Sequence, residues 1–175
     1  MGPDRILIIR HAEHHGEPGI DGDGRLDRHS LTVRGWQCAG ALIPFFRSAD
    51  APVPTPGAIF TSAVAPGSES RRPQQTVAPL HAVLRDGGLV AYDERFSKPE
   101  TDALMAEVMT RHGTVLVAWE HSEIPACVAE LPDAPPVPSE WPNDRYDLVW
   151  ALERRGSGWA FTQIAQRLLA GDRQA

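Results

Sequence analysis

Residues 5–11 read RILIIRH, so four consecutive aliphatic residues are followed directly by an arginine and a histidine. A short aliphatic run of this kind predicts a buried β-strand. A strand that ends in reactive side chains places them at the carboxyl edge of its sheet, where open α/β folds keep their ligand crevice. The sequence therefore predicts a functional site at Arg10 and His11.

Similar arrangements recur further along the chain. Residues 115–121 read VLVAWEH, so His121 closely follows another apolar run. Arg72 lies in the segment after another buried-looking strand, predicted at residues 58–61. Two histidines and two arginines that meet at one edge of a sheet are suited to hold a phosphoryl group and attack it. Guanidinium groups pair with two oxygens at once, and a neutral imidazole is a competent nucleophile.

The composition predicts one globular domain over residues 1–175. With 175 residues, of which 42% are hydrophobic, the chain is long enough to bury a substantial core. Its net charge of −6 argues against a general nucleic-acid or membrane-surface binder, since such proteins need a broad positive field. We therefore expect neither a nucleic acid nor a membrane as a partner, and any anion site must be local. The oligomeric state stays open.

The two cysteines, Cys38 and Cys127, have no metal-site spacing, and a disulfide scaffold would be unusual in a domain of this size. We expect both to be reduced core residues. The amino terminus shows no signal peptide, and no apolar stretch approaches the roughly 20 residues that a membrane helix needs. These features predict a soluble, cytoplasmic protein.

Short aliphatic runs alternate with helical patterns, which is the sequence form of a mainly parallel sheet. The turn at Gly156-Ser157-Gly158 predicts a hairpin that adds an antiparallel edge strand. Two irregular segments, residues 14–29 and 131–142, are expected to carry specificity as loops over the crevice. Strands are predicted at residues 5–9, 58–61, 89–92, 115–119, 147–152 and 159–163.

Four helices are expected between these strands. The first begins after Thr32 as N-cap, and the third after Thr101 as N-cap. Pro73 and Pro125 are good first-turn residues for the second and the fourth. Pro79 should kink or split the second helix, because proline removes a backbone hydrogen bond in a helix interior.

The motifs resemble those of the histidine phosphatase superfamily. The sequence Arg10-His11-Ala12-Glu13 is similar to its Arg-His-Gly-Glu signature after the first strand, and Trp119-Glu120-His121-Ser122 replaces the common Gly-His-Ser. Arg72 stands four residues before Thr76, as in the second-arginine motif. The resemblance spans residues 5 to about 128 and keeps the family's order of motifs. Its other matches are Leu31-Thr32 with Gly35, Ala39 and Leu42, and Ser62 after the second strand.

The resemblance implies a phosphoglycerate-mutase-like α/β fold, a three-layer αβα sandwich, and a phosphatase that needs no metal or other cofactor. His11 would attack phosphorus and form a phosphohistidine, while Arg10, Arg72 and His121 would clamp the transferring group. The substrate would be a phosphomonoester or a phosphoprotein, so the partner is a phosphorylated small molecule or protein. Further substrate-binding residues would be Ser62, His14 and Ser122.

The family draws the proton for the leaving group from a carboxylic acid. The segment Asp93-Glu94-Arg95-Phe96 resembles the family's acid segment, which makes Glu94 the candidate general acid. Glu120 is expected to point away from His121 if both lie on a regular strand, because alternate side chains of a strand face opposite sides. Three other carboxylates stay open as alternatives: Glu100, Asp102 and Glu13.

Two departures from the family pattern affect the predicted activity. Ala12 stands where the family has glycine, and its Cβ would clash if the backbone there needed a positive φ. Glu17 falls where mutase-type members place a phosphate-binding asparagine, and a carboxylate would repel phosphate. Two further departures join them: Cys38 stands where the family's first helix often has glutamine, and the Lys98-Pro99 region lacks the glycine-rich stretch that follows the mutase acid. Together the four departures disfavour a glycolytic mutase and leave a phosphatase. The alternatives are a phosphoryl mutase and a catalytically silent member that binds a phosphorylated ligand.

Overall fold

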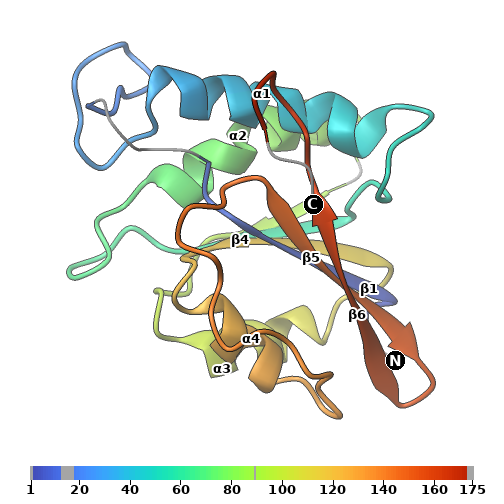
Figure 1. Cartoon of the computed structure of the whole chain (residues 1–175). Helices are drawn as coiled ribbons and strands as arrows, with labels where there is room; N and C mark the ends of the chain where they lie inside the picture. Colours follow the sequence, from blue (N-terminus) through green and yellow to red (C-terminus); the bar gives the residue numbers. More distant parts are fainter. Residues whose placement is uncertain (1, 13–17, 89, 173–175) are drawn as a thin grey trace.

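Figure 1 shows the computed structural model, which describes residues 2–12, 18–88 and 90–172. Within these residues the strands form one sheet in the order β3-β2-β4-β1-β5-β6. Along the chain the elements are β1 (Arg5–Arg10), α1 (Val33–Arg47), β2 (Ala58–Thr61), α2 (Arg72–Asp86), β3 (Ala91–Asp93), α3 (Thr101–Val108), β4 (Thr114–Trp119), α4 (Ile124–Ala129), β5 (Leu148–Arg155) and β6 (Gly158–Ala165).

Helices cover both faces of the sheet: α1 and α2 lie on one face, and α3 and α4 lie on the other (Figure 1). Along β1, Ile6 and Ile8 pack into the core on the side of α3 and α4, whereas Leu7 and Ile9 pack into the core on the side of α1 and α2. Because both faces are buried, residues 6–9 of β1 are all apolar instead of alternating with polar residues. The predicted three-layer αβα sandwich is confirmed.

The central strands β1 and β4 create the crevice. They are parallel neighbours, yet the chain leaves β1 toward α1 on one face and leaves β4 toward α4 on the opposite face. Such a change of direction opens a crevice between the carboxyl ends of the two strands. Arg10 lies opposite Trp119 in this pair, so residues 11 and 120 are the first beyond the sheet on the two sides of the crevice.

Strand β5 brings a further segment to this edge. It pairs antiparallel with β1, with Ile9 opposite Val149, so the residues that precede β5 arrive beside the end of β1. The hairpin from β5 to β6 turns at Gly156, which has a φ of +62° that glycine adopts without strain. The predicted antiparallel edge strand is confirmed as β6. Beyond it, the chain returns to α1, where Asp172 accepts a hydrogen bond from Arg34 at 2.9 Å.

Three helix predictions had different outcomes. Thr32 is the N-cap of α1, since its hydroxyl accepts a hydrogen bond from the amide of Gly35 at 3.1 Å. The expected split of the second helix is wrong: α2 runs through Pro79 unbroken. The N-cap position of α3 is Glu100, so the prediction of Thr101 at that position is also wrong; Thr101 is the first helical residue and is buried.

The two cysteines are not bonded to each other. Cys127 is buried in α4, and this burial raises the pKa of its thiol to about 12. Cys38 is only half-buried on α1. The expected core position is therefore confirmed for Cys127 and only in part for Cys38. None of the helices that the structure describes has the length and apolarity needed to cross a membrane.

Candidate active site

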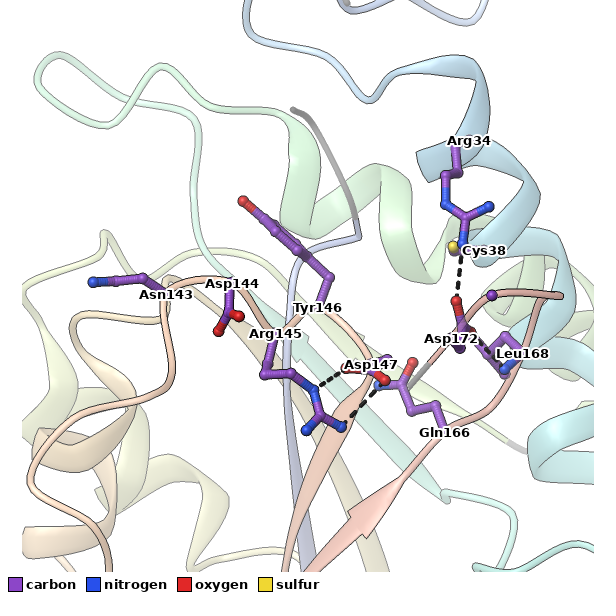
Figure 2. Close-up of a pocket in the computed structure, with 11 residues that line it drawn as sticks. Arg34, Cys38, Asn143, Asp144, Arg145, Tyr146, Asp147, Gln166, Leu168 and Asp172 are labelled. Atoms are coloured by element: carbon purple, nitrogen blue, oxygen red, sulfur yellow. Dashed lines mark hydrogen bonds and ion pairs between the residues drawn. The ribbon is translucent and has the colours of Figure 1, made fainter. Parts of the chain in front are cut away.

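Arg10 ends β1 as a buried cation, with only 3% of its surface exposed. Its Nη1 donates to the carbonyl of Asn143 at 2.7 Å, and its Nη2 donates to the Tyr146 hydroxyl at 2.9 Å. The guanidinium carbon lies 3.7 Å from the centroid of the Tyr146 ring. Both partners belong to the segment that leads into β5, which Figure 2 shows. Burial lowers the pKa of Arg10, although the charges of Tyr146 and Glu120 act in the opposite direction.

His11 follows directly and is 1% exposed. Its Nδ1 lies 2.9 Å from the carbonyl oxygen of Ala12. A carbonyl oxygen only accepts, so Nδ1 carries the proton, and Nε2 is the atom that can supply a lone pair. The amide of Ala12 donates to Thr76 Oγ1 at 2.8 Å, and this hydroxyl donates to the carbonyl of Arg72 at 2.7 Å. The first turn of α2 is thereby bonded to the end of β1.

Ala12 fits its position without the clash expected for a Cβ. Among the residues described, positive φ values outside glycine occur at Asp133 and Arg167, so Ala12 has an ordinary backbone conformation. Its side chain packs in a small core cluster with Leu31 and Ala39. The methyl group therefore joins α1 to the end of β1.

Glu120 lies inside the site, and the prediction that it points away from His121 is wrong. Strand β4 ends at Trp119, so the alternation of a regular strand does not extend to residues 120 and 121. Glu120 Oε1 accepts a hydrogen bond from His121 Nδ1 at 2.7 Å and lies 4.0 Å from His11 Nε2. Its Oε2 lies 3.0 Å from Lys98 Nζ. The carboxylate thus joins the two histidines and one lysine.

The charge around Glu120 is positive. Burial alone would raise the pKa of its carboxyl group, but electrostatic interactions with His11, Lys98 and His121 and the hydrogen bond from Lys98 outweigh this effect and hold the pKa well below its usual range. The same carboxylate raises the pKa of Arg10 and Arg72 against the effect of their burial. Three permanent cations therefore surround one carboxylate and two imidazoles.

Metal ligation is chemically open to part of this group. One ligand atom each from His11, Glu120 and His121 lie within 4.8 Å of one another, and this set of donors is one that Zn²⁺ accepts. Lys98 already binds the second oxygen of Glu120, and two arginine charges act on the same carboxylate. Positive surroundings of this kind favour an anion over a metal ion.

Arg72 is the first residue of α2. Its Nε donates to the carbonyl of Ser30 at 3.2 Å, and its Nη2 donates to the carbonyl of Arg28. Burial lowers its pKa, while the charges of Glu120, Tyr146 and Asp27 raise it. The structure thus brings the two arginines and two histidines predicted from sequence around Glu120.

The predicted substrate-binding residues have different positions. Ser62 directly follows β2 and is fully buried, and its hydroxyl has no hydrogen-bond partner among the described residues. Ser122 is exposed and donates to Glu123 at 3.2 Å. His14 lies outside the described residues, as do Glu13 and Glu17.

The candidate acid Glu94 lies at the outer edge of the sheet. It follows β3, is exposed, and accepts a hydrogen bond from the Tyr92 hydroxyl at 2.9 Å. In the described part of the chain no contact joins Glu94 to either histidine of the site. The alternative acids Glu100 and Asp102 are also exposed, and Glu100 accepts hydrogen bonds from the amide and hydroxyl of Ser97.

Two cavities flank the segment that leads into β5. One, of about 330 Å³, includes His121 and Ser122 in its lining and reaches Trp141 and Asn143. The other, of about 410 Å³, lies between Tyr146 and α1, where Arg34 and Cys38 line it (Figure 2). The predicted loop at residues 131–142 therefore contributes to the wall of the first cavity, beside His121.

Sequence reasoning missed Lys98 and Tyr146 as members of the site. The signal for Tyr146 was the strand after it: an antiparallel strand beside β1 brings its beginning to the edge where β1 ends. The signal for Lys98 is weaker, because its position depends on a tertiary contact in which the Trp119 indole donates to the Lys98 carbonyl at 3.1 Å.

Solved structures resemble this chain over nearly its whole length. A protein assigned as the phosphohistidine phosphatase SixA from Agrobacterium tumefaciens matches with a TM-score of 0.53 and 19% identity, over 93% of this chain and 99% of that one. A second protein assigned as SixA, from Nakamurella multipartitia, matches with a TM-score of 0.54 and 20% identity, over 93% and 95%. The α-ribazole phosphatase from Shigella flexneri matches with a TM-score of 0.55 and 15% identity, over 97% and 100%.

Neither the scan against protein-family models nor the search of curated proteins finds a match. At identities of 20% or less, the structural similarity concerns the fold. It agrees with the order of motifs along the sequence, from the Arg-His pair after the first strand to the histidine after the fourth. The chain therefore has the fold of the histidine phosphatase superfamily.

Proposed function

We propose that this protein is a metal-independent phosphatase that hydrolyses a phosphomonoester or a phosphoprotein through a phosphohistidine on His11. The observation that carries the proposal is the hydrogen bond of His11 Nδ1 to the Ala12 carbonyl. It assigns the proton to Nδ1 and leaves Nε2, which lies 4.0 Å from Glu120 Oε1, as the nucleophilic atom.

The charges of the site support phosphoryl transfer. In the transition state, negative charge spreads over the equatorial oxygens of the phosphoryl group, and fixed cations stabilise it. Arg10 and Arg72 supply two guanidinium groups, and His121 supplies a further donor. Two buried donors near the strand ends, Arg10 Nε and Ser62 Oγ, have no partner among the described residues, and an oxyanion would satisfy such groups.

The reaction has two steps. In the first, His11 Nε2 attacks phosphorus, a P–N bond forms, and the bond from phosphorus to the leaving-group oxygen breaks while this oxygen takes a proton. In the second, water attacks phosphorus and gives its proton to the acid that was deprotonated in the first step. The P–N bond breaks, His11 is regenerated and inorganic phosphate is released. Glu94 is the proposed acid of the first step on the strength of its motif, although the described contacts bind it to Tyr92.

The names of the structural neighbours fit both proposed substrate classes. SixA is named for a phosphohistidine, a protein modification, whereas the α-ribazole phosphatase is named for a small molecule. Both classes present a terminal phosphoryl group to the enzyme, so the same arrangement of arginines and histidines serves either.

Turnover of p-nitrophenyl phosphate in the presence of a chelator tests the proposal. The wild type should release nitrophenol at a rate that the chelator does not change, and His11→Ala should lower this rate by about 10⁴-fold or more. His112→Ala is the matched control, because His112 is exposed at the opposite end of the sheet before β4 and should have no effect. Absence of turnover in the wild type would contradict the proposal and favour a silent binding protein.

A further inference from the structure

The group of cations in the site already holds an anion of the chain itself. Glu120 presents Oε1 to His121 at 2.7 Å and Oε2 to Lys98 at 3.0 Å. Its side chain is 18% exposed, and the charges of Arg10 and Arg72 act on it as well. These are the groups expected to bind the oxygens of a phosphoryl group.

The position of this carboxylate coincides with that of the reacting group. Reacting atoms must approach to about 3–3.5 Å before bond formation, so phosphorus has to lie next to His11 Nε2. Glu120 Oε1 lies 4.0 Å from this nitrogen. A phosphoryl group with its three oxygens and the Glu120 carboxylate cannot occupy this space together, and their negative charges repel each other.

We propose that Glu120 is an internal anion that occupies the phosphoryl site of the free protein, and that a phosphorylated ligand must displace it. The inference rests on the proposed function of the site as a phosphoryl site. On displacement, the ligand's oxygens take over the donors of His121 and Lys98, so Lys98 becomes a further ligand-binding residue. Glu120 thereby regulates the affinity of the site.

The consequence is an affinity lower than the cations alone would provide. When the competent state is only fractionally populated, the apparent dissociation constant rises in inverse proportion to that fraction. Removing the charge of Glu120 removes the competition and releases Lys98 at the same time. Because displacement precedes the chemical step, this change should lower KM for an aryl phosphate.

Binding of inorganic phosphate, measured by calorimetry in the presence of a chelator, tests the proposal. Glu120→Gln keeps the size of the side chain and removes its charge, and it should bind phosphate about tenfold more tightly than the wild type. Glu123→Gln is the matched control. It removes the same charge three residues further on, where the carboxylate accepts from Ser122 and does not contact either histidine, and its affinity should stay within about twofold of the wild type.

A double variant tests whether the gain in phosphate affinity comes from the released Lys98. Adding Lys98→Met to Glu120→Gln should abolish most of the increase in phosphate affinity, and thermal unfolding shows whether each variant is folded. If Glu120→Gln does not fold, Glu120→Asp keeps the charge but shortens the side chain. It should then loosen the contacts to His121 and Lys98 and tighten phosphate binding by a smaller factor.

Unchanged or weaker phosphate binding in folded Glu120→Gln would overturn the inference. The result is separable from the proposed function, because phosphate binding needs no turnover. A protein without phosphatase activity whose Glu120→Gln variant binds phosphate more tightly would refute the proposed function alone. An active phosphatase whose variant shows no gain would refute the role of Glu120 alone.

Discussion

The carboxyl ends of the central strands β1 and β4 differ sharply from those of the outer strands β2 and β3. At the central pair, Arg10 and His11 are almost fully buried, and Glu120 binds His121 and Lys98. At the outer pair, the candidate acid Glu94 is exposed and bound by Tyr92. Similar residue types at the same edge of one sheet thus have different surroundings.

The topology explains this difference. The connections after β1 and β4 leave toward opposite faces, and this opens a crevice where buried charges can meet a ligand. The connections after β2 and β3 also leave toward opposite faces, so distance makes the difference. Strand β3 lies three strands from β1, which corresponds to about 14 Å at the usual spacing of strands. A position at the carboxyl edge therefore does not by itself bring a residue into contact with the two histidines.

The strongest test of the comparison concerns the two arginines of β1. Arg10→Lys keeps the charge but loses the planar fork that binds the Asn143 carbonyl and the Tyr146 hydroxyl, and kcat/KM for an aryl phosphate should fall by about 10²- to 10³-fold. Arg5→Lys, at the other end of the strand and paired with Glu153, should change kcat/KM less than twofold. Equal losses in both folded variants would contradict a special role for the central carboxyl edge.

The second largest effect is expected from replacing Glu94, the candidate acid that follows β3. A general acid assists most when the leaving group is poor, so Glu94→Gln should slow an alkyl phosphate by about 10² or more and p-nitrophenyl phosphate much less. The comparison requires steady-state rates with both substrates. Glu100→Gln serves as control, since its carboxylate is bound to Ser97 at the start of α3. Unchanged turnover of the alkyl phosphate would exclude Glu94 and confine the chemistry to the central pair.

The central and the outer strand ends each contain a tyrosine whose hydroxyl can be removed by substitution with phenylalanine. Tyr146→Phe removes the hydroxyl that accepts a hydrogen bond from Arg10 and keeps the ring beside the guanidinium group. A hydrogen bond to a charged group contributes about 1.5–3 kcal/mol, so kcat/KM for an aryl phosphate should fall by about 10- to 10²-fold. A variant with wild-type kinetics would show that Tyr146 does not position Arg10.

Tyr92→Phe removes the corresponding hydroxyl at the outer pair, where it lies 3.2 Å from Thr61 Oγ1 and donates to Glu94. Burial raises the pKa of this phenol to about 12, so it stays protonated. Its loss should lower the free energy of unfolding by about 1 kcal/mol and leave turnover of an aryl phosphate within about twofold. Denaturant unfolding and kinetics measure the two effects; a tenfold loss of turnover would place the outer pair in the site.

The sequence predicts the fold well because its signals are local. Aliphatic runs such as residues 6–9 and 115–118 are buried on both faces, and the capping hydroxyl of Thr32 lies at the start of α1. Pro79 misled the prediction, because packing of Val77, Leu80 and Leu84 against the sheet supports a continuous helix despite the missing hydrogen bond.

The candidate site is only partly predictable. Arg10, His11 and His121 follow from strand ends and motifs, since chain connectivity alone places them at one edge. The orientation of Glu120 depends on where β4 ends, and a difference of one residue there decides whether alternation applies. Lys98 and Tyr146 enter through tertiary contacts across the sheet, which no short segment of sequence encodes.

Trapping the intermediate tests the central claim most directly. The wild type, mixed with a radiolabelled aryl phosphate and quenched rapidly, should carry a phosphoryl label that is stable in base and labile in acid, located on His11. The variant His11→Ala should carry no such label and show no burst of leaving group. Equal labelling of the wild type and His11→Ala, or a label stable in acid, would contradict a phosphohistidine at this position.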